Sequence, residues 1–356
     1  MNALDRLDAA RAALAEDAAR ALRLLPGAAA LPRPLRPERD LVAAEALRAM
    51  GFFTRAERLY AAVLARSRGA ADAALRTEAA LGSAAGLRAL GKTVQAGARL
   101  ALARGAGLKG FAARLKLEEA LVLRAAERYA EAVALLKPML AASLRKRAWD
   151  EAAFLFWAIG GARRFQGRLA EAEAAFDSSR AMAKRAGDRP GQGYALFGIG
   201  GAARVRGDLL GSEKAYGEAA RLFAGSDDFF ARAYAACGRS NALRQLGRLA
   251  EAERGYREAY RLYSRLGDAV DLAYVDWGWG EVLLKRGALK PALSRLRAAE
   301  RAFRAGHETR GVVLCLHSSA RALHSLGKTA QAERLFSEGL ALARNAGIHT
   351  HLESFT

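Results

Sequence analysis

Small, large and polar residues follow one another along this chain in a pattern that returns about every forty residues. The stretch GRLAEAERGY at 247–256 has close copies at 167–176 (GRLAEAEAAF), 207–216 (GDLLGSEKAY) and 327–336 (GKTAQAERLF). A poorer copy begins at 287, and further copies begin at 51, 91 and 127, which makes eight. A fixed period of this size is typical of stacked structural repeats.

Three positions of the motif keep their size in every copy when its first residue is numbered 0. Positions −7 and +5 are always small, and position +9 is always large and apolar. The residues at +9 are Tyr60, Leu100, Leu136, Phe176, Tyr216, Tyr256, Leu296 and Phe336. Small residues on two neighbouring helices let the helix axes approach closely. Position +9 lies one turn after +5, so we expect its side chain to fill the gap to the next repeat.

The same motif predicts two helices in each repeat. Glycine at position 0 favours the end of a first helix, because glycine readily adopts the left-handed conformation found there. A second breaker follows the second helix, for example AGD at 186–188 and LGD at 266–268. Abundant Ala, Leu, Arg and Glu favour helices as well. Eight helix–turn–helix repeats therefore tile residues 37–352.

This pattern resembles the tetratricopeptide repeat (TPR) family, whose repeat has a small residue in the first helix, an alanine early in the second and an aromatic four residues later. The period of about forty is similar to the longer repeats of Pins-type spindle-orientation adaptors and of many bacterial signalling proteins. The early tryptophan and the terminal proline of the family are mostly missing. The resemblance implies an all-α fold, a right-handed α-solenoid superhelix of about eight TPR-like repeats.

The segments outside the repeats are expected to cap or connect them. In the N-terminal segment 1–25, residues 3–25 predict one amphipathic helix that caps the first repeat, because leucines recur there at helical spacing. Residues 26–36 form a proline-rich connector, and 353–356 form a short tail. No polar capping helix follows the last repeat, so we expect a partner or a second copy of the chain to cover its outer face.

The resemblance implies that the first helices line a concave groove and that ligands bind along positions −13, −10, −6, −3 and −2. Position −3 is arginine in six consecutive repeats, and aromatic residues recur at −13 and −10 in repeats four to seven. Guanidinium groups match carboxylates bidentately, which favours an acidic ligand. Gly161 and Gly201 would leave room for a ligand backbone. The candidate partner-binding residues are Phe154, Trp157, Tyr194, Phe197, Tyr234, Asn241, Tyr274, Trp277, Arg124, Arg164, Arg204 and Arg244.

Structural explanations compete with this interpretation. Arginines near a helix C-terminus can stabilise the helix dipole without binding a ligand. The aromatic residues can simply pack between neighbouring first helices. The formal net charge of +20 can reflect an arginine-rich, solvated surface, or it can indicate an acidic partner.

The sequence favours no catalytic chemistry. The glycine-rich GIGGAA at 198–203 lacks the preceding strand of a dinucleotide site. The five histidines have no recognisable metal spacing, and only His317, His324 and Glu281 approach a catalytic cluster. Cys237 has no motif partner that would make it a nucleophile. We therefore expect no enzyme activity, cofactor or metal.

Two cysteines, no signal-like N-terminus and no long apolar run predict a cytoplasmic protein without a membrane span. The leading hypothesis is a scaffold that binds an extended or helical, acidic protein segment. One alternative is a regulatory sensor that binds a small peptide signal and relays its occupancy to a partner. The other is a helical-repeat protein for single-stranded RNA, although nucleic acid is the less favoured partner.

Overall fold

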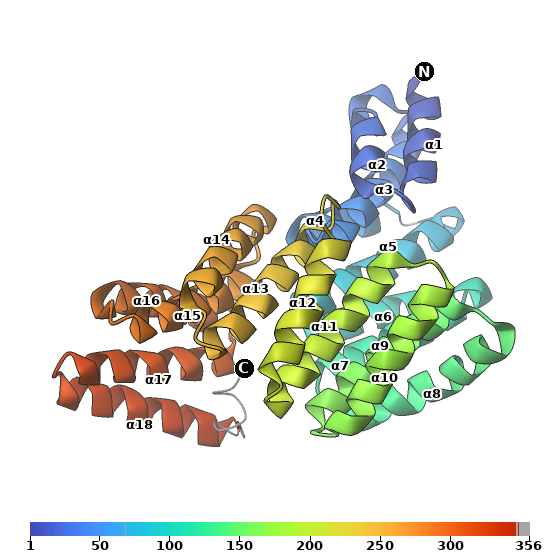
Figure 1. Ribbon diagram of the computed structural model, residues 1–356. Helices are drawn as coiled ribbons and strands as arrows, with labels where there is room; N and C mark the ends of the chain where they lie inside the picture. The colour runs from blue at the N-terminus through green and yellow to red at the C-terminus, as the bar shows by residue number, and fades with distance from the viewer. Residues whose placement is uncertain (68, 347, 349–356) are drawn as a thin grey trace. The chain divides into compact units, whose positions relative to one another are not determined.

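The structure, a computed structural model, describes residues 1–67, 69–346 and 348 (Figure 1). Eighteen α-helices and no strand occur in these residues, which confirms the predicted all-α fold of helix–turn–helix repeats. Sixteen of the helices form eight consecutive pairs. The pairs are α3 (Arg36–Ala49) and α4 (Phe53–Arg66), α5 (Ala73–Ala89) and α6 (Thr93–Gly105), α7 (Ala112–Ala125) and α8 (Tyr129–Lys146), α9 (Trp149–Phe165) and α10 (Leu169–Arg185), α11 (Arg189–Arg206) and α12 (Leu209–Leu222), α13 (Phe229–Gln245) and α14 (Leu249–Leu266), α15 (Ala269–Lys285) and α16 (Leu289–Ala305), and α17 (Thr309–Ser325) and α18 (Thr329–Asn345).

The helices divide into two compact units. Unit 1 comprises Met1–Gly191 and Gly225–Asp228, and unit 2 comprises Gln192–Ala224 and Phe229–Thr356. Unit 1 therefore holds the first four helix pairs, and unit 2 holds the last four apart from the first residues of α11.

The turn inside each repeat has the geometry that the glycine at position 0 predicts. Gly247 has a φ of 78°, and the amide of Arg248 donates a hydrogen bond of 2.9 Å back to the carbonyl of Leu243. These features close the C-terminus of α13. Glu127 takes the same left-handed conformation, with a φ of 62°, in the copy that lacks the glycine. This conformation costs a residue with a side chain about 1–2 kcal/mol.

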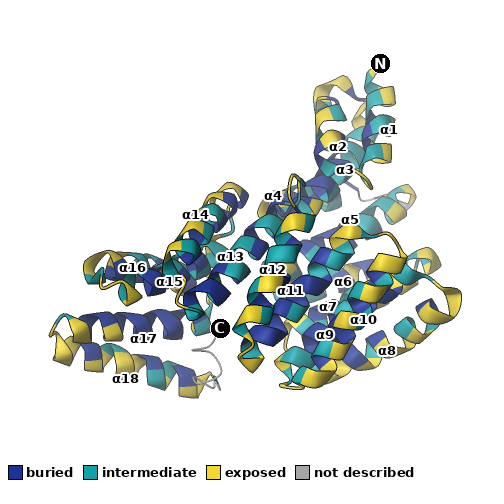
Figure 2. Cartoon of the chain, in the orientation of Figure 1, coloured by how far each residue is buried: buried dark blue, intermediate teal, exposed yellow. Residues whose placement is uncertain are grey.

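The large residue at +9 packs against small residues of its own repeat and of the next one. A Cβ atom at Gly200, position −7, would lie 2.9 Å from the ring of Tyr216 in the same repeat. A Cβ atom at Gly278 of α15 would lie 2.6 Å from the ring of Tyr256, which belongs to the preceding repeat. The residues at +9 are accordingly buried, except Phe336 of the last repeat, which is 50 % exposed. Figure 2 shows buried residues along the helices of the repeats.

The N-terminal prediction of one helix over 3–25 is wrong, because two helices form there: α1 (Ala3–Ala13) and α2 (Ala18–Leu24). Asp17 starts the second helix, since its Oδ1 accepts a hydrogen bond of 2.6 Å from the amide of Arg20. Leu7 packs with Val42 of α3 in one apolar cluster. The connector contains two short 3₁₀ turns, at Ala28–Ala30 and Arg33–Leu35.

Candidate functional site

In unit 1, four first helices carry arginine at position −3, and two of these arginines bind a carboxylate. Arg48 Nη2 donates to Glu45 Oε2 at 2.6 Å, and Arg48 Nε donates to the hydroxyl of Tyr60 at 3.2 Å. That hydroxyl donates in turn to Glu45 Oε1 at 2.6 Å. Arg88 Nε donates to Glu118 Oε1 at 2.6 Å. These bonds to side chains show how a charge at position −3 is balanced inside the protein.

Arg124, the next arginine of the row, has a different environment. Its guanidinium carbon lies 4.6 Å from the ring centroid of Trp157, in cation–π geometry. Burial, together with the positive charges of Arg88 and Arg164, lowers the pKa of Arg124 to about 10. The carboxylate of Glu118 opposes this effect only in part, so a further anion near Arg124 would relieve the repulsion.

The space beside Gly161 belongs to Arg124, not to a ligand backbone as the sequence suggested. A Cβ atom at Gly161 would lie 2.5 Å from Nη1 of Arg124. The small residue is thus explained by close packing of α9 against the arginine of α7.

Aromatic side chains of α9 lie next to this part of the arginine row. Phe154 is 40 % exposed, and its ring centroid is 5.6 Å from that of the half-buried Trp157. Arg164 lies over the ring of Phe165, with its guanidinium carbon 4.4 Å from the centroid. The structure thus brings Phe154 and Trp157 together and places Arg124 against Trp157.

In unit 2, two of the five predicted aromatic residues lie in the packing between helices. Phe197 is 6 % exposed, and its ring centroid is 4.9 Å from that of Tyr234. Trp277 is 5 % exposed, and its Nε1 donates to Ser318 Oγ at 3.0 Å. Packing therefore accounts for these two residues.

The three predicted tyrosines of unit 2, Tyr194, Tyr234 and Tyr274, are half-buried. The hydroxyl of Tyr274 donates to Glu308 Oε1 at 2.9 Å. Their partial exposure keeps them candidates for contact with a ligand.

Arg244 lies in a buried polar cluster of unit 2, 4 % exposed. Its Nε donates to the hydroxyl of Tyr256 at 3.3 Å, and that hydroxyl donates to Asn241 Oδ1 at 2.7 Å. The C-terminus of α13 is capped by Lys285, because Lys285 Nζ donates to the carbonyl of Arg244 at 3.3 Å. Helix capping therefore describes Lys285 better than it describes the Arg244 side chain.

One carboxylate in this cluster, that of Glu281, lies within ion-pair distance of two arginines. Glu281, 3 % exposed, has Oε2 at 3.9 Å from Arg244 Nη1 and both oxygens at 3.2 Å from Arg321 Nη1. Arg204 is also buried, at 8 % exposure, and its charge acts on both Tyr256 and Cys237.

Burial also changes the acid–base behaviour of groups near the cluster. It raises the pKa of the Cys237 thiol to about 12, which keeps the thiol protonated and unsuited to nucleophilic attack. Burial and the neighbouring Asp268 raise the pKa of Asp271 to about 8. At neutral pH this carboxyl group therefore carries little of the charge that could balance the arginines.

Reasoning from the sequence missed the part that the tyrosine at +9 plays in this cluster. Tyr60 and Tyr256 were expected only to fill the gap between repeats, yet their hydroxyls bind the arginine at −3 of the same repeat. The signal was present, because Arg at −3 and Tyr at +9 occur together in repeats one, five and six.

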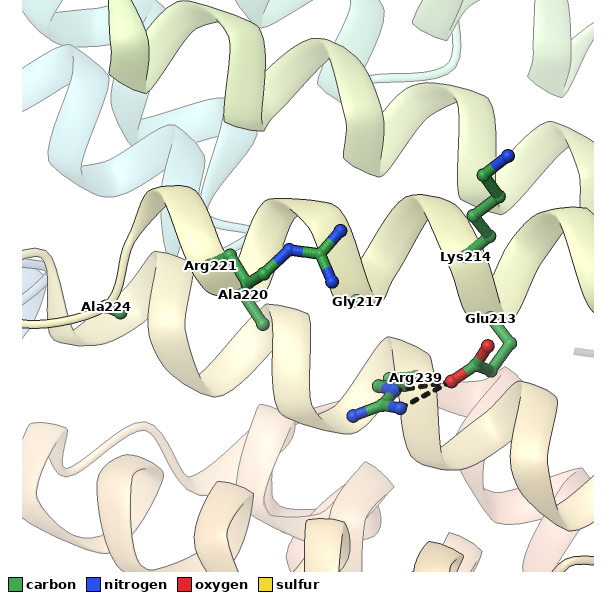
Figure 3. Close-up of a pocket in the computed structure, with 7 residues that line it drawn as sticks. All are labelled: Glu213, Lys214, Gly217, Ala220, Arg221, Ala224 and Arg239. Carbon is green, nitrogen blue, oxygen red and sulfur yellow. Dashed lines mark hydrogen bonds and ion pairs between the residues drawn. The ribbon is translucent and has the colours of Figure 1, made fainter.

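A pocket of about 360 Å³ lies between α12 and α13 (Figure 3). Arg239 projects from α13 toward α12, and its Nε donates to Glu213 Oε1 at 2.7 Å. Lys214 and Arg221 give this pocket further positive charge. Its lining comes mostly from a second helix, so it is separate from the predicted row of first-helix residues.

The other features that the sequence singled out have structural explanations or lie outside the described part. GIGGAA lies inside α11, where Gly200 packs against Tyr216. His317 stacks near Phe336, with ring centroids 5.2 Å apart, and His349 and His351 lie outside the described residues. In the part of the chain that is described, no group of three or more His, Cys, Asp or Glu could hold a metal ion, and no helix is long and apolar enough to cross a membrane.

Comparisons with known proteins support the fold. No model of a protein family matches the sequence, and no curated protein matches it. The structure is similar to that of a Rap protein complexed with competence and sporulation factor, with a TM-score of 0.69, 12 % identity and 99 % of each chain covered. It is also similar to BtubC (BKLC) from P. vanneervenii, with a TM-score of 0.51 and 15 % identity over 61 % of this chain and 92 % of that one. At these identities the likeness shows a TPR-like helical-repeat fold.

Proposed function

We propose that this protein is a non-catalytic interaction scaffold that binds an extended or helical, acidic segment of a partner protein along its first helices. The observation that carries the proposal is the crowding of Arg88, Arg124 and Arg164 in unit 1. Arg124 is a half-buried cation on which the positive charges of Arg88 and Arg164 act more strongly than the opposing charge of Glu118, which is bound to Arg88. A ligand with carboxylates would relieve this repulsion, and the exposed ring of Phe154 offers an apolar anchor beside it.

The proposal is tested by selecting peptides from a displayed library of random twelve-residue sequences on the wild-type protein. We expect the selected peptides to be enriched in Asp and Glu and to bind more weakly as salt is raised. The double variant Arg124→Gln, Arg164→Gln should lose at least about tenfold in affinity, since one charged hydrogen bond contributes about 1.5–3 kcal/mol.

The matched control removes the same charge from second helices. Arg58 of α4 and Arg145 of α8 are both exposed, so the variant Arg58→Gln, Arg145→Gln should bind the selected peptides like the wild type. Circular dichroism would establish that both double variants are folded. An equal loss of affinity in the two double variants would mean that only net charge matters. A failure to select any binding peptide would contradict the scaffold proposal.

A second candidate function is a regulatory sensor for a small peptide. It is favoured by the likeness, over nearly the whole of both chains, to a Rap protein whose solved structure includes competence and sporulation factor. This function requires a change of shape when the ligand binds, which small-angle X-ray scattering with and without a selected peptide would measure. An unchanged scattering profile would favour a plain scaffold.

Single-stranded RNA binding is less well supported. Stacking of bases needs aromatic faces that a ligand can reach. Phe197 and Trp277, two of the candidate aromatics, are buried by protein neighbours. Titration of the wild-type protein with a labelled single-stranded RNA would test this alternative, because RNA bound as tightly as the selected peptides would favour it.

A further inference from the structure

The first and sixth repeats contain the same arrangement of an arginine and a tyrosine. In repeat one, Arg48 at −3 donates through Nε to the hydroxyl of Tyr60 at +9, over 3.2 Å. In repeat six, Arg244 and Tyr256 occupy the same positions and make the same bond at 3.3 Å. The two pairs can therefore be compared atom by atom.

The third member of the arrangement, at position −6, differs between the two repeats. In repeat one it is Glu45, whose two oxygens accept from the Tyr60 hydroxyl and from Arg48 Nη2, both at 2.6 Å. In repeat six it is Asn241, whose Oδ1 accepts only the Tyr256 hydroxyl, at 2.7 Å. Among the described residues, the buried Nη2 of Arg244 has no hydrogen-bond partner. The atom that binds a carboxylate in repeat one is therefore unsatisfied in repeat six, which is costly for a buried charged donor.

The surroundings of Arg244 supply only part of the missing negative charge: against the effect of burial, Tyr256 and Glu281 raise the pKa of Arg244. The charges of Arg204, Lys285 and Arg321 act in the same cluster, while Glu281 reaches Arg244 only at 3.9 Å and is shared with Arg321. Asp271 has a raised pKa of about 8, so it is mostly neutral at pH 7. The buried Arg244 therefore shares the carboxylate of Glu281 with Arg321, which lies closer to it.

Some members of this cluster are accessible to solvent. Arg244 itself is buried, but Asn241 is half-buried, and Lys285 and Arg321 are exposed. These three side chains are long or polar, so they can move and add hydrogen bonds to an incoming anion.

We propose that Arg244 binds a carboxylate of the partner segment, in the place that Glu45 takes against Arg48 in the first repeat. This inference rests on the proposed scaffold function and names one subsite of it. The carboxylate can come from an Asp or Glu side chain or from a C-terminus, because both present the same two oxygens to a guanidinium group. Asn241 is then the residue that keeps the subsite open, since a glutamate there would fill it from within.

The decisive variant is Asn241→Glu, which should copy the closed arrangement of repeat one. We expect it to fold with a midpoint of unfolding at least equal to that of the wild type, because it satisfies Arg244 Nη2. The control is Asn241→Gln, which has the same length as the glutamate but leaves the subsite uncharged. Unfolding followed by circular dichroism would verify that both variants are folded.

The first readout uses acetate as the probe and needs no knowledge of the partner. The Nε–Hε signal of Arg244 is followed by NMR in protein labelled with ¹⁵N-arginine and is assigned with Arg244→Lys. At constant ionic strength, acetate in place of chloride should shift this signal in a saturable way in the wild type and in Asn241→Gln, but not in Asn241→Glu. The proposal would be overturned if replacing chloride by acetate left the Arg244 signal of the wild type unshifted. It would also be overturned if acetate shifted the signal in Asn241→Glu as much as in the wild type.

The second readout uses the peptides selected on the wild-type protein. Replacing their Asp and Glu residues singly by Asn and Gln, and their C-terminal acid by an amide, should identify one carboxylate whose loss weakens binding about tenfold or more. The same peptides should lose affinity for Asn241→Glu to a similar extent. Peptides that bind the wild type and Asn241→Glu with equal affinity would contradict this inference but not the proposed scaffold function. An acetate response without any selected peptide would support the subsite and count against the scaffold.

Discussion

The substitution Gly278→Ala tests whether close contact between neighbouring repeats specifies this fold. Gly278 is buried in α15, two residues before the small residue at position −7 of its repeat. A Cβ atom there would lie 2.6 Å from Cε1, Cζ and the hydroxyl oxygen of Tyr256. Tyr256 is fully buried and hydrogen-bonded to Arg244 and Asn241, so its ring has little freedom to move away.

The expected effect combines two opposing terms. Replacing glycine by alanine inside a helix stabilises it by about 0.5–1 kcal/mol, whereas overpacking a tight contact costs about 1–3 kcal/mol. We therefore expect a net loss of about 1–2 kcal/mol in the free energy of unfolding. Gly217→Ala in α12 is the matched control, because the nearest atom to its added Cβ lies at an ordinary 3.5 Å. The helix term is common to both variants, so their difference isolates the overpacking term.

Urea denaturation followed by circular dichroism gives the first comparison of the two variants. Stacked repeats can unfold in parts, so hydrogen exchange in α14 and α15 should accompany it. Gly278→Ala should unfold at lower urea and exchange faster in these two helices, and Gly217→Ala should be at least as stable as the wild type. If Gly278→Ala proved as stable as Gly217→Ala, the contact of Tyr256 with α15 would not be a constraint on this fold.

Two further predictions follow from burial. Phe176→Ala should lower the free energy of unfolding by about 3–5 kcal/mol, because the ring is 2 % exposed. Phe336→Ala should cost at most about half as much, since half of that side chain is already exposed; equal losses in denaturation midpoints would contradict the packing argument. Asp271 has a folded-state pKa of about 8, above its ordinary value of 3.8, so ionising it in the folded protein is unfavourable. Wild-type stability should therefore decline as the pH rises from about 4 to about 8, and Asp271→Asn should reduce that decline in midpoints measured across this range; an identical pH profile in the variant would refute the assignment.

The repeat positions were predictable because their physical requirements are local. A left-handed turn selects glycine, as at Gly247, and two close helices select small residues, as at Gly200 facing Tyr216. The break at Asp17 was missed because periodic leucines continue through it, although aspartate is itself a strong N-cap signal. The candidate site was predictable only as a set of positions, which included Arg124, Trp157, Asn241 and Arg244.

The sequence by itself determined the fold class, the paired helices of each repeat and the recurrence of arginines and aromatic residues at fixed positions of the first helices, because each of these repeats with a constant spacing. Only the tertiary structure decided what each member of that row does. Trp277 is buried and hydrogen-bonded to Ser318, and Arg124 occupies the space beside Gly161. Nη2 of Arg48 donates to Glu45, whereas Nη2 of Arg244 has no hydrogen-bond partner among the described residues. The physical reason is that burial and charge balance depend on neighbours from other helices and repeats, whose identity at each contact varies even when the spacing does not.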